Sequence, residues 1–490
     1  MSRTGTVPNE PQRPPEPQRP ASLAETVAEA LEATLGTEVH HLVRLSAGAS
    51  RETWAFDTDR PLILQRRATA GATSGGTTSG GTSAGEQDSS ITTSVAQEAD
   101  LLRAARAAGV AVPEVVASGD GVDEPLGAPW MICARVPGES LPRTLLRDER
   151  FAGVRAGLAR RCGEAIGAIH RIDPEPFVGR LSEEDQIASL RRVLDTVSDV
   201  SAVFELVLRW LELNPAPRRD RVVVHGDFRT GNLLVDHDDS DAAGLTAVLD
   251  WELTHLGNPV EDLGWFCVRA WRFGSPHRAG GFGPVEDLLA GYRAVSGEDV
   301  TSQELAWWEL LGTVKWGVIC AMQAHYHLSG ATRSVELAAI GRRIAENEHD
   351  ALNLLAELVG GELAGQAPDE VSHLSDDRAR SLYGRPTAAE LLEGVREFLA
   401  DDVLAATEGR VRFHTRVAIN VLAIVERELA AGEAPAGRHA ERLAVLGVGS
   451  DEELAEAIRA GAFDERLLAV ASQLRGSVED RLSVANPGYR

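Results

Sequence analysis

The sequence predicts an α+β fold, in which strands come early in the chain and helices fill most of the remainder. Between residues 41 and 64, apolar and polar residues alternate in three short runs separated by turns, which is typical of antiparallel strands. From Ala152 onward the apolar residues mostly recur at helical spacing, and one strand-rich segment, 221–251, interrupts them. Strands followed by helices are the pattern of an α+β protein.

The individual elements follow from local patterns. Ser22 is a suitable N-cap for a helix that runs to about Leu35, because apolar residues repeat there at intervals of four. A second helix is expected over 94–108, and further strands begin at Val112 and at Trp130. After a break rich in Gly and Pro, helical patterns return and predict an all-α C-terminal domain, with helices over 388–399, 411–429 and 451–460.

Composition marks the boundaries between these parts. Residues 1–20 are rich in Pro, Arg and Glu and lack an apolar stretch, so they predict a disordered arm and not a secretory signal. A Gly/Ser/Thr tract is too polar to pack and predicts a flexible insertion. The expected organisation is an arm at 1–20, a strand-rich lobe at 21–137 with the insertion at 68–93, a mainly helical lobe at 138–358, a linker at 359–386 and a helical domain at 387–490.

The overall composition excludes several classes of protein. The formal net charge of −25 argues against general nucleic-acid binding, and no apolar run approaches the length needed to cross a membrane. Four scattered cysteines form no CxxC pair, which argues against a zinc site or a disulfide framework and favours a reducing cytoplasm. Of the 49 basic residues only Lys315 is a lysine, so arginine must take the roles that lysine has elsewhere.

The chemistry is indicated by two neighbouring strand ends. Asp227 lies directly after the apolar run at 222–224, Asn232 follows five residues later, and Asp250 ends the next apolar strand. Phosphoryl transfer needs a carboxylate that accepts the hydrogen bond of the incoming hydroxyl, and oxygen ligands that hold Mg²⁺ across the phosphates. Asp227 suits the first role, and Asn232 and Asp250 suit the second. The alternative is structural, with Asp227 capping a helix and Asn232 in a turn.

These residues also resemble a known family. The pattern His225-Gly-Asp-x4-Asn232, followed by Leu-Asp250-Trp-Glu, is similar to the catalytic and metal-binding motifs of aminoglycoside and choline kinase-like phosphotransferases. The resemblance implies a bilobal protein-kinase-like fold, ATP as phosphate donor and Mg²⁺ as cofactor. It also implies that His225 and Asp262 brace the catalytic loop. Arg229, in the same loop, is expected to be a further catalytic residue.

The same resemblance implies a nucleotide site in the strand-rich lobe. The turn that begins at Ser46 would cover the phosphates, and an ordinary hairpin turn is the alternative. A basic residue on the third strand would contact the phosphates and pair with a helix glutamate, here Glu98. Arg66 is chosen over Gln65, which points to the opposite face of the strand. The hinge that holds adenine through backbone groups would include Met131 and Cys133.

The phosphate acceptor is indicated by resemblance alone. The run from His225 to Pro259 is similar to the kinase domain fused to certain acyl-CoA dehydrogenases and to its free-standing bacterial relatives, over roughly residues 20–355. This branch implies phosphorylation of the 4-hydroxyl of a 4-hydroxyacyl-CoA in hydroxy-acid and levulinate breakdown, with an acyl-CoA dehydrogenase-like enzyme acting downstream. An aminoglycoside, macrolide or amino-alcohol kinase is the alternative, and an inactive nucleotide-binding scaffold is another.

The C-terminal segment, from about residue 385, resembles a small helical protein of unknown biochemical role that accompanies such bacterial kinases. Its basic run places Arg412 and Arg416 four residues apart, on one face of a helix. We expect these two arginines, together with Lys315, to contact an acyl-CoA acceptor, because guanidinium groups bind phosphates well. The alternatives are a solvated helix start for the arginines and an ordinary surface position for Lys315.

Overall fold

The computed structural model describes residues 23–47, 51–67, 93–197, 201–237, 244–361 and 386–489. They form two compact units, one with the described residues between 23 and 67 and Val115–Arg135, the other with 93–114 and the described residues from Val136 onward. The expected arm at 1–20 lies outside the described residues, as do 68–92 of the expected insertion and 362–385 of the expected linker.

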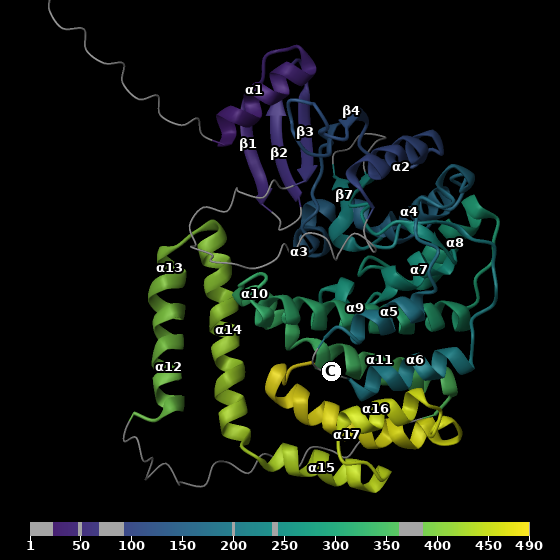
Figure 1. Cartoon of the computed structure of the whole chain (residues 1–490), viewed down its shortest axis with the longest axis vertical. Coiled ribbons are helices and arrows are strands. Elements are labelled where there is room, and N and C mark those ends of the chain that lie inside the picture. Colours follow the sequence, from purple (N-terminus) through teal and green to yellow (C-terminus); the bar gives the residue numbers. More distant parts are fainter. Residues whose placement is uncertain are drawn as a thin grey trace, which may run out of the picture. The chain divides into compact units, whose positions relative to one another are not determined.

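The first unit is a five-stranded sheet with one helix, α1 (Leu23–Leu35) (Figure 1). Every pair of neighbouring strands is antiparallel. The three consecutive strands that the alternating pattern predicted are present, and the two later strands complete the sheet. The strand order is β1 (His40–Ala47), β2 (Arg51–Asp57), β3 (Pro61–Arg67), β5 (Trp130–Ala134) and β4 (Val115–Gly119).

The core of this unit lies between α1 and the sheet. Val27 and Leu31 of α1 are fully buried in one apolar cluster with Trp54, Leu62 and Leu64 of the sheet. Residues two apart on a strand face the same side, so burial alternates along β3. On α1 the buried residues Val27 and Leu31 are four apart, and on β3 the buried residues are two apart. These are the two spacings from which the sequence predicted a helix and strands.

The second unit contains the strand-rich segment that the sequence predicted among helices. Two separate two-stranded antiparallel sheets form there. In the first, β6 (Val222–Val224) pairs with β9 (His255–Gly257), and in the second, β7 (Leu233–Asp236) pairs with β8 (Gly244–Val248). The chain therefore leaves β6, makes a loop, and enters the neighbouring sheet at β7.

The helices of this unit gather around α9 (Ser302–Ser329). Thr301 caps its N-terminus, because the Thr301 side chain accepts a hydrogen bond from the backbone N–H of Glu304, and Gly330 caps its C-terminus. From Glu304 to Ala321, α9 is buried on most sides, as its many apolar residues require. Its neighbours include α7, α10 and α11, while α4 packs against α8. The helices up to residue 359 are α2 (Val95–Ala107), α3 (Pro142–Arg147), α4 (Ala152–Ile169), α5 (Gln186–Leu194), α6 (Ala202–Leu213), α7 (Val260–Cys267), α8 (Val285–Ser296), α9, α10 (Val335–Gly341) and α11 (Ile344–Val359).

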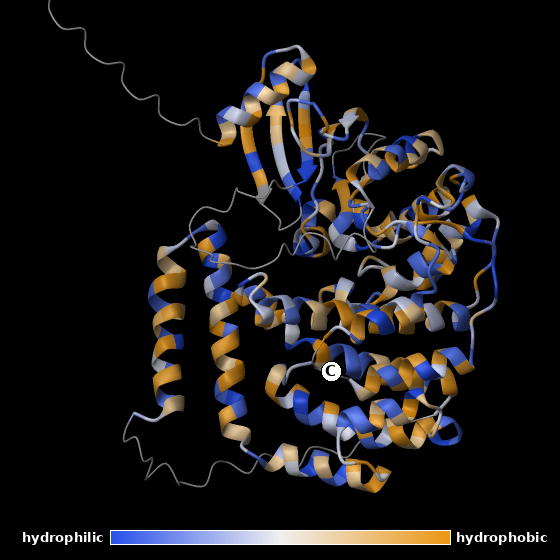
Figure 2. Ribbon diagram, in the orientation of Figure 1, coloured by the Kyte–Doolittle hydropathy of each residue, from blue (hydrophilic) through white to orange (hydrophobic). Residues whose placement is uncertain are grey.

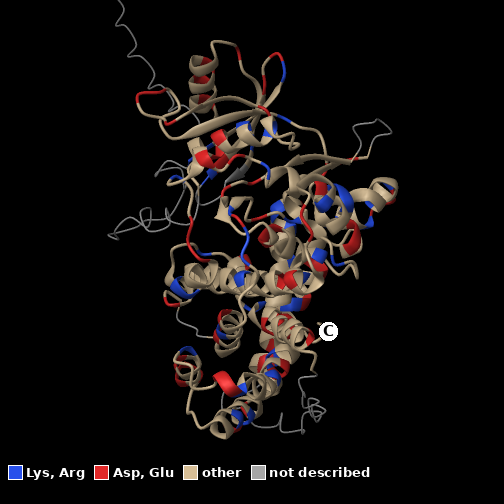
Figure 3. Ribbon diagram, turned by 90° about the vertical axis from the view of Figure 1, so that its right-hand side faces the viewer, with Lys and Arg blue, Asp and Glu red and all other residues tan. Residues whose placement is uncertain are grey.

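The described chain beyond residue 386 is helical throughout its regular elements. Helix α16 packs on α6, and α17 packs on both α6 and α11. Helix α12 packs against α14, and apolar and polar residues are interspersed along both of these helices (Figure 2). Acidic and basic residues are interspersed along the helices of this unit (Figure 3). These helices are α12 (Ala388–Phe398), α13 (Leu404–Ala406), α14 (Gly409–Ala431), α15 (Ala434–Leu446), α16 (Asp451–Arg459) and α17 (Leu467–Ala485).

The order of elements confirms the α+β class, with an antiparallel sheet first, a helical remainder and an all-α C-terminal region. Within the part of the chain that the structure describes, no helix is both long enough and apolar enough to span a membrane.

Candidate active site

The loop between β6 and β7 carries the first group of predicted site residues. It turns at Gly226, whose φ of +79° lies in the left-handed region. A side chain at this position would overlap the carbonyl oxygen of Leu253, so both the backbone conformation and the space require glycine. After a short 3₁₀ turn, η3 (Thr230–Asn232), the chain enters β7. This path places Asp227 just beyond the end of a buried strand.

Asp227 is surrounded by hydrogen-bond donors. Its carboxylate accepts from the indole Nε1 of Trp265 at 2.9 Å and from the amide Nδ2 of Asn232 at 2.7 Å. The Nε atom of Arg229 lies 3.1 Å from one carboxylate oxygen and 3.0 Å from the other. The side chain of Asp227 is therefore held in one orientation, with 8% of the residue exposed.

Asp262, on α7, fixes the backbone of this loop through hydrogen bonds. Its carboxylate accepts from the backbone N–H of His225 at 2.8 Å and of Gly226 at 2.9 Å, and from Nε2 of His170 at 3.1 Å. Burial alone would raise the pKa of Asp262, but the His170 hydrogen bond and the other donors lower it to about 2. Asp262 is thus a fully buried anion with three donors, in the position that the resemblance implied for a loop brace.

His225 connects this loop to the strand end that carries Asp250. Its Nδ1 accepts from the backbone N–H of Asp227 at 3.2 Å, so its Nε2 donates to the carbonyl oxygen of Leu249 at 3.2 Å. Burial lowers the pKa of His225, which is consistent with a neutral ring that carries its proton on Nε2. The ring therefore acts as a fixed spacer between the two loops.

Asn232 and Asp250 are brought to neighbouring positions. The backbone oxygen of Asn232 accepts from the N–H of Leu249, directly before Asp250, at 2.8 Å. Both hydrogen bonds of the Asn232 side chain use Nδ2, one to the carboxylate and one to the backbone oxygen of Asp227. Asp250 adopts a φ of +67°, a conformation that residues other than glycine rarely hold and that is frequent at functional sites.

The donor set at this position fits a hard cation. An amide oxygen and a carboxylate are ligands of Mg²⁺, which is usually bound by one or two carboxylates together with phosphate oxygens and water. Within the described ranges, no group of three or more His, Cys, Asp or Glu side chains could hold a metal ion. Asn232 and Asp250 could therefore hold Mg²⁺ together with a phosphate, but not as a cage of protein ligands.

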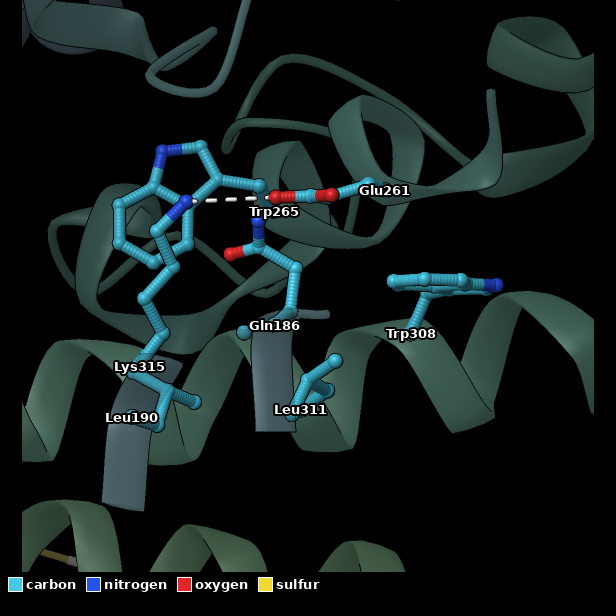
Figure 4. Close-up of a pocket in the computed structure, with 8 residues that line it drawn as sticks. Gln186, Leu190, Glu261, Trp265, Trp308, Leu311 and Lys315 are labelled. Carbon is cyan, nitrogen blue, oxygen red and sulfur yellow. Dashed lines mark hydrogen bonds and ion pairs between the residues drawn. The ribbon is translucent and has the colours of Figure 1, made fainter. Parts of the chain in front are cut away.

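Lys315 reaches the same loop from α9. Its Nζ donates to the carbonyl oxygen of Gly226 at 3.1 Å, forms an ion pair with Glu261 at 3.4 Å and lies 5.0 Å from the ring centre of Trp265. Figure 4 shows the ammonium beside the indole ring and joined to Glu261, in a small pocket of α5, α7 and α9. The structure thus places Lys315 in contact with the loop between β6 and β7, engaged with groups of the protein.

Sequence reasoning missed several residues of this site. Trp265 lies one turn after Asp262 on α7. Helical spacing could therefore have placed Trp265 on the same face of the helix as Asp262. Glu261 also accepts a hydrogen bond from Nε2 of His255 at 2.9 Å. His170 forms a second hydrogen bond, between its Nδ1 and the hydroxyl of Tyr292, at 3.1 Å. No local pattern in the sequence marks the His170–Tyr292 contact, because these two residues come from the C-terminal end of α4 and from α8, which are far apart in the chain.

The residues predicted for the nucleotide are found in both units. Arg66 is buried on β3, directly opposite Glu52 of β2, and its Nε donates to that carboxylate at 2.9 Å. Its neighbour Gln65 is half-buried on the other face of the strand. Glu98 is a buried residue of α2 in the second unit, so its pairing with Arg66 stays a prediction. The Arg66–Glu52 pair was not anticipated, although alternation along both strands allows it.

The remaining predicted residues are placed as follows. Met131 and Cys133 are buried on β5, where they pair in register with β3. Ser46 belongs to β1, and residues 48–50 of the turn that follows lie outside the described residues. Arg412 and Arg416 are exposed on α14, so they are accessible to a ligand. The described contacts do not join them to the catalytic loop.

Comparisons with known proteins match two parts of the chain to sequence families. Residues 41–303 match the phosphotransferase enzyme family (APH), and residues 405–489 match a domain of unknown function (DUF6285). The chain is 27% identical over 190 residues to acyl-CoA dehydrogenase family member 10 of Mus musculus, which covers 36% of this chain and 17% of that protein. It is 36% identical over 83 residues to family member 11 of Gallus gallus, which covers 16% and 10%.

Among solved structures, the chain resembles a protein of Ralstonia eutropha assigned as an aminoglycoside phosphotransferase, with a TM-score of 0.51 and 20% identity over 67% of this chain and 98% of the other. This likeness shows the fold. The family match covers more than half of the 490 residues and includes the loop with Asp227, Asn232 and Asp250. The chain therefore belongs to the phosphotransferase enzyme family.

Proposed function

We propose that this enzyme transfers the γ-phosphoryl group of ATP to the 4-hydroxyl of a 4-hydroxyacyl-CoA, with Mg²⁺ as cofactor. The observation that best supports phosphoryl transfer is the fixed orientation of the Asp227 carboxylate, which accepts a hydrogen bond from the side chain of Asn232. The acyl-CoA acceptor is supported by the two relatives named as acyl-CoA dehydrogenase family members, of which this chain spans only a small part.

In the proposed reaction, Asp227 accepts the hydrogen bond of the acceptor hydroxyl and takes its proton as the oxygen attacks phosphorus. The new O–P bond forms while the bond from the γ-phosphorus to ADP breaks. Asn232 and Asp250 hold the cation, which supplies neutralisation of the phosphate charge. His225 and Asp262 keep the loop in place, so that little rearrangement is needed when charge develops.

The acceptor site is proposed to include Arg412 and Arg416, because CoA carries several negative charges and the chain has a net charge of −25. A cytoplasmic location and a downstream enzyme of the acyl-CoA dehydrogenase type complete the proposal. Such a partner would consume the phosphorylated acyl-CoA.

The test is an ATP-consumption screen of the purified full chain with Mg²⁺. The acceptors are 3-, 4- and 5-hydroxyacyl-CoAs, the free hydroxy acids, an aminoglycoside, a macrolide and choline. We expect turnover with 4-hydroxyacyl-CoA and loss of that turnover in the absence of Mg²⁺. Turnover with an aminoglycoside, a macrolide or choline only would replace the acceptor, and no turnover with any compound would favour an inactive scaffold.

A further inference from the structure

The segment after α17, residues 486–489, returns to the helical core of the second unit. The Tyr489 hydroxyl donates to Oδ2 of Asp350, on α11, at 2.6 Å. The other oxygen of that carboxylate accepts from Nη1 of Arg269 at 3.0 Å. The guanidinium of Arg269 lies over the Tyr489 ring, 4.6 Å from its centre. Tyr489 thus contacts Arg269 both directly and through Asp350.

Arg269 begins the 3₁₀ turn η4 (Arg269–Arg272), which packs against η3 (Thr230–Asn232) of the loop that carries Asp227. Trp271, two residues later, packs against Trp265 with ring centres 5.1 Å apart. The guanidinium of Arg229 lies 5.0 Å from the ring centre of Trp271. Both Trp265 and Arg229 donate to the carboxylate of Asp227. A continuous series of contacts therefore runs from Tyr489 to Asp227.

The position of the Tyr489 segment is fixed by the domain of unknown function. Helix α17 packs along α11 and α6, and three polar contacts join α17 and the residue after it to α11. The three contacts are Asn486 Nδ2 to Glu346 at 3.0 Å, Arg475 Nη1 to Asn353 at 2.9 Å and Arg481 to Glu348 at 2.9 Å.

Burial raises the pKa of Asp350, while the hydrogen bond from Tyr489 and the charge of Arg269 oppose this shift.

We propose that Tyr489 is a positioning residue for phosphoryl transfer, which it serves by fixing η4 and thereby the side chains around Asp227. This gives the domain of unknown function a role: it supplies, from its own sequence, a support for the active site of the phosphotransferase. The proposal rests on Asp227 acting as the base, and it does not depend on which acceptor is phosphorylated.

The test compares two variants of the full chain with a matched control. Tyr489→Phe removes the hydroxyl, and Tyr489→Ala also removes the ring under Arg269. The control, Asp464→Asn, weakens another contact between the same two parts of the chain, since Arg209 of α6 donates to Asp464 at 2.8 Å and 2.5 Å. The Arg209–Asp464 pair makes no contact with η4 among the described interactions.

Hydrogen exchange of the backbone amides is the first measurement, because it needs no acceptor. In Tyr489→Ala we expect faster exchange in peptides that cover 265–273 and also in those that cover 225–232. In Asp464→Asn we expect faster exchange near α6 and α16 only. Unchanged exchange at 225–232 in Tyr489→Ala, or the same pattern in the control, would overturn the proposal.

Kinetics with the acceptor found in the screen is the second measurement. A support of the base predicts that kcat falls about tenfold in Tyr489→Phe and further in Tyr489→Ala, while the KM for ATP stays within about twofold. Asp464→Asn should lose thermal stability but keep its kcat. A loss of kcat that merely follows the melting temperature in all three variants would contradict a positioning role. If no acceptor is phosphorylated, the proposed function fails while the exchange experiment still decides this inference.

Discussion

At the scale of single residues, the contacts of Asp227 determine how an acceptor can reach it. A carboxylate offers about four lone-pair sites, and here one oxygen receives Trp265 and Arg229 while the other receives Asn232 and Arg229. The Arg229 side chain is 27% exposed, whereas Trp265 and Asn232 are buried. Arg229 is therefore the partner that we expect to give way to the incoming hydroxyl in the proposed reaction.

Asp227→Asn should abolish most of the activity without unfolding the protein. The amide keeps the shape of the side chain but cannot take a proton, so we expect kcat to fall about 1,000-fold. The affinity for MgATP, measured by calorimetry, should change little, whereas Asp250→Asn should weaken it. Asp59→Asn, at an exposed turn, is the control. Activity close to wild type in Asp227→Asn would remove this residue from the mechanism.

Lys315→Met tests the role of the only lysine. The change keeps a long apolar stem but removes the donor to the Gly226 carbonyl and the partner of Glu261. Because this ammonium supports the loop, we expect kcat to fall about tenfold with little change in either KM. The sequence suggested instead a contact with the acceptor, and that role would raise the KM for the acceptor. Lys315→Arg, which restores the charge, should recover part of kcat.

At the scale of elements, α7 carries the brace of the catalytic loop and so ties the stability of this unit to pH. The Asp262 pKa of about 2 lies below the ordinary value of 3.8, so on acidification the unfolded chain takes up this proton before the folded protein does. The contribution of Asp262 to stability is therefore complete above about pH 4 and is lost as the pH falls toward 2. This shift corresponds to about 2 kcal/mol.

Asp262→Asn should accordingly destabilise the protein at neutral pH by about 2 kcal/mol or more, since one amide group cannot accept from all three donors. The difference from wild type should shrink between pH 4 and pH 2, as measured by urea unfolding at a series of pH values. The exposed Asp59→Asn control should follow the wild-type curve. A difference that stays constant over this range would show that the charge of Asp262 is not the cause.

The elements also show what the sequence could and could not predict. Alternation and helical spacing located the sheet and most helices, and strand ends located Asp227, Asn232 and Asp250. The Arg66–Glu52 pair lies on neighbouring strands and was missed because the expected partner, Glu98, was taken from the family pattern. Trp265 and Lys315 come from two helices that meet only in the folded chain, and no local pattern encodes that meeting.

At the scale of the whole molecule, the helical domain has two proposed roles that differ in their kinetic signature. The exposed arginines of α14 are proposed to bind the acceptor, while the Tyr489 segment is proposed to support the base. The first role acts on KM and the second on kcat. The two can therefore be separated in one chain by variants that lie on different helices.

Replacing Arg412 and Arg416 together by Ala should raise the KM for an acyl-CoA acceptor about tenfold, because each guanidinium can donate two hydrogen bonds to phosphate. The KM for ATP should stay unchanged. Adding salt should weaken acyl-CoA binding in the wild type and have less effect on the double variant. Replacing Arg438, which pairs with Asp480 elsewhere in the domain, serves as the control. An unchanged KM for acyl-CoA would return these arginines to a purely solvated role.

The near-absence of lysine has a chemical consequence for an enzyme proposed to handle thioesters. A thioester slowly acylates any free amine that it meets, whereas an arginine side chain remains protonated and does not react in this way. With 48 arginines and one lysine, this chain offers such a reagent a single side-chain amine. The Lys315 side chain is 14% exposed, and its amine is engaged with the Gly226 carbonyl and Glu261. The one side-chain amine whose acylation would disturb the loop of Asp227 is thus largely shielded from the proposed substrate.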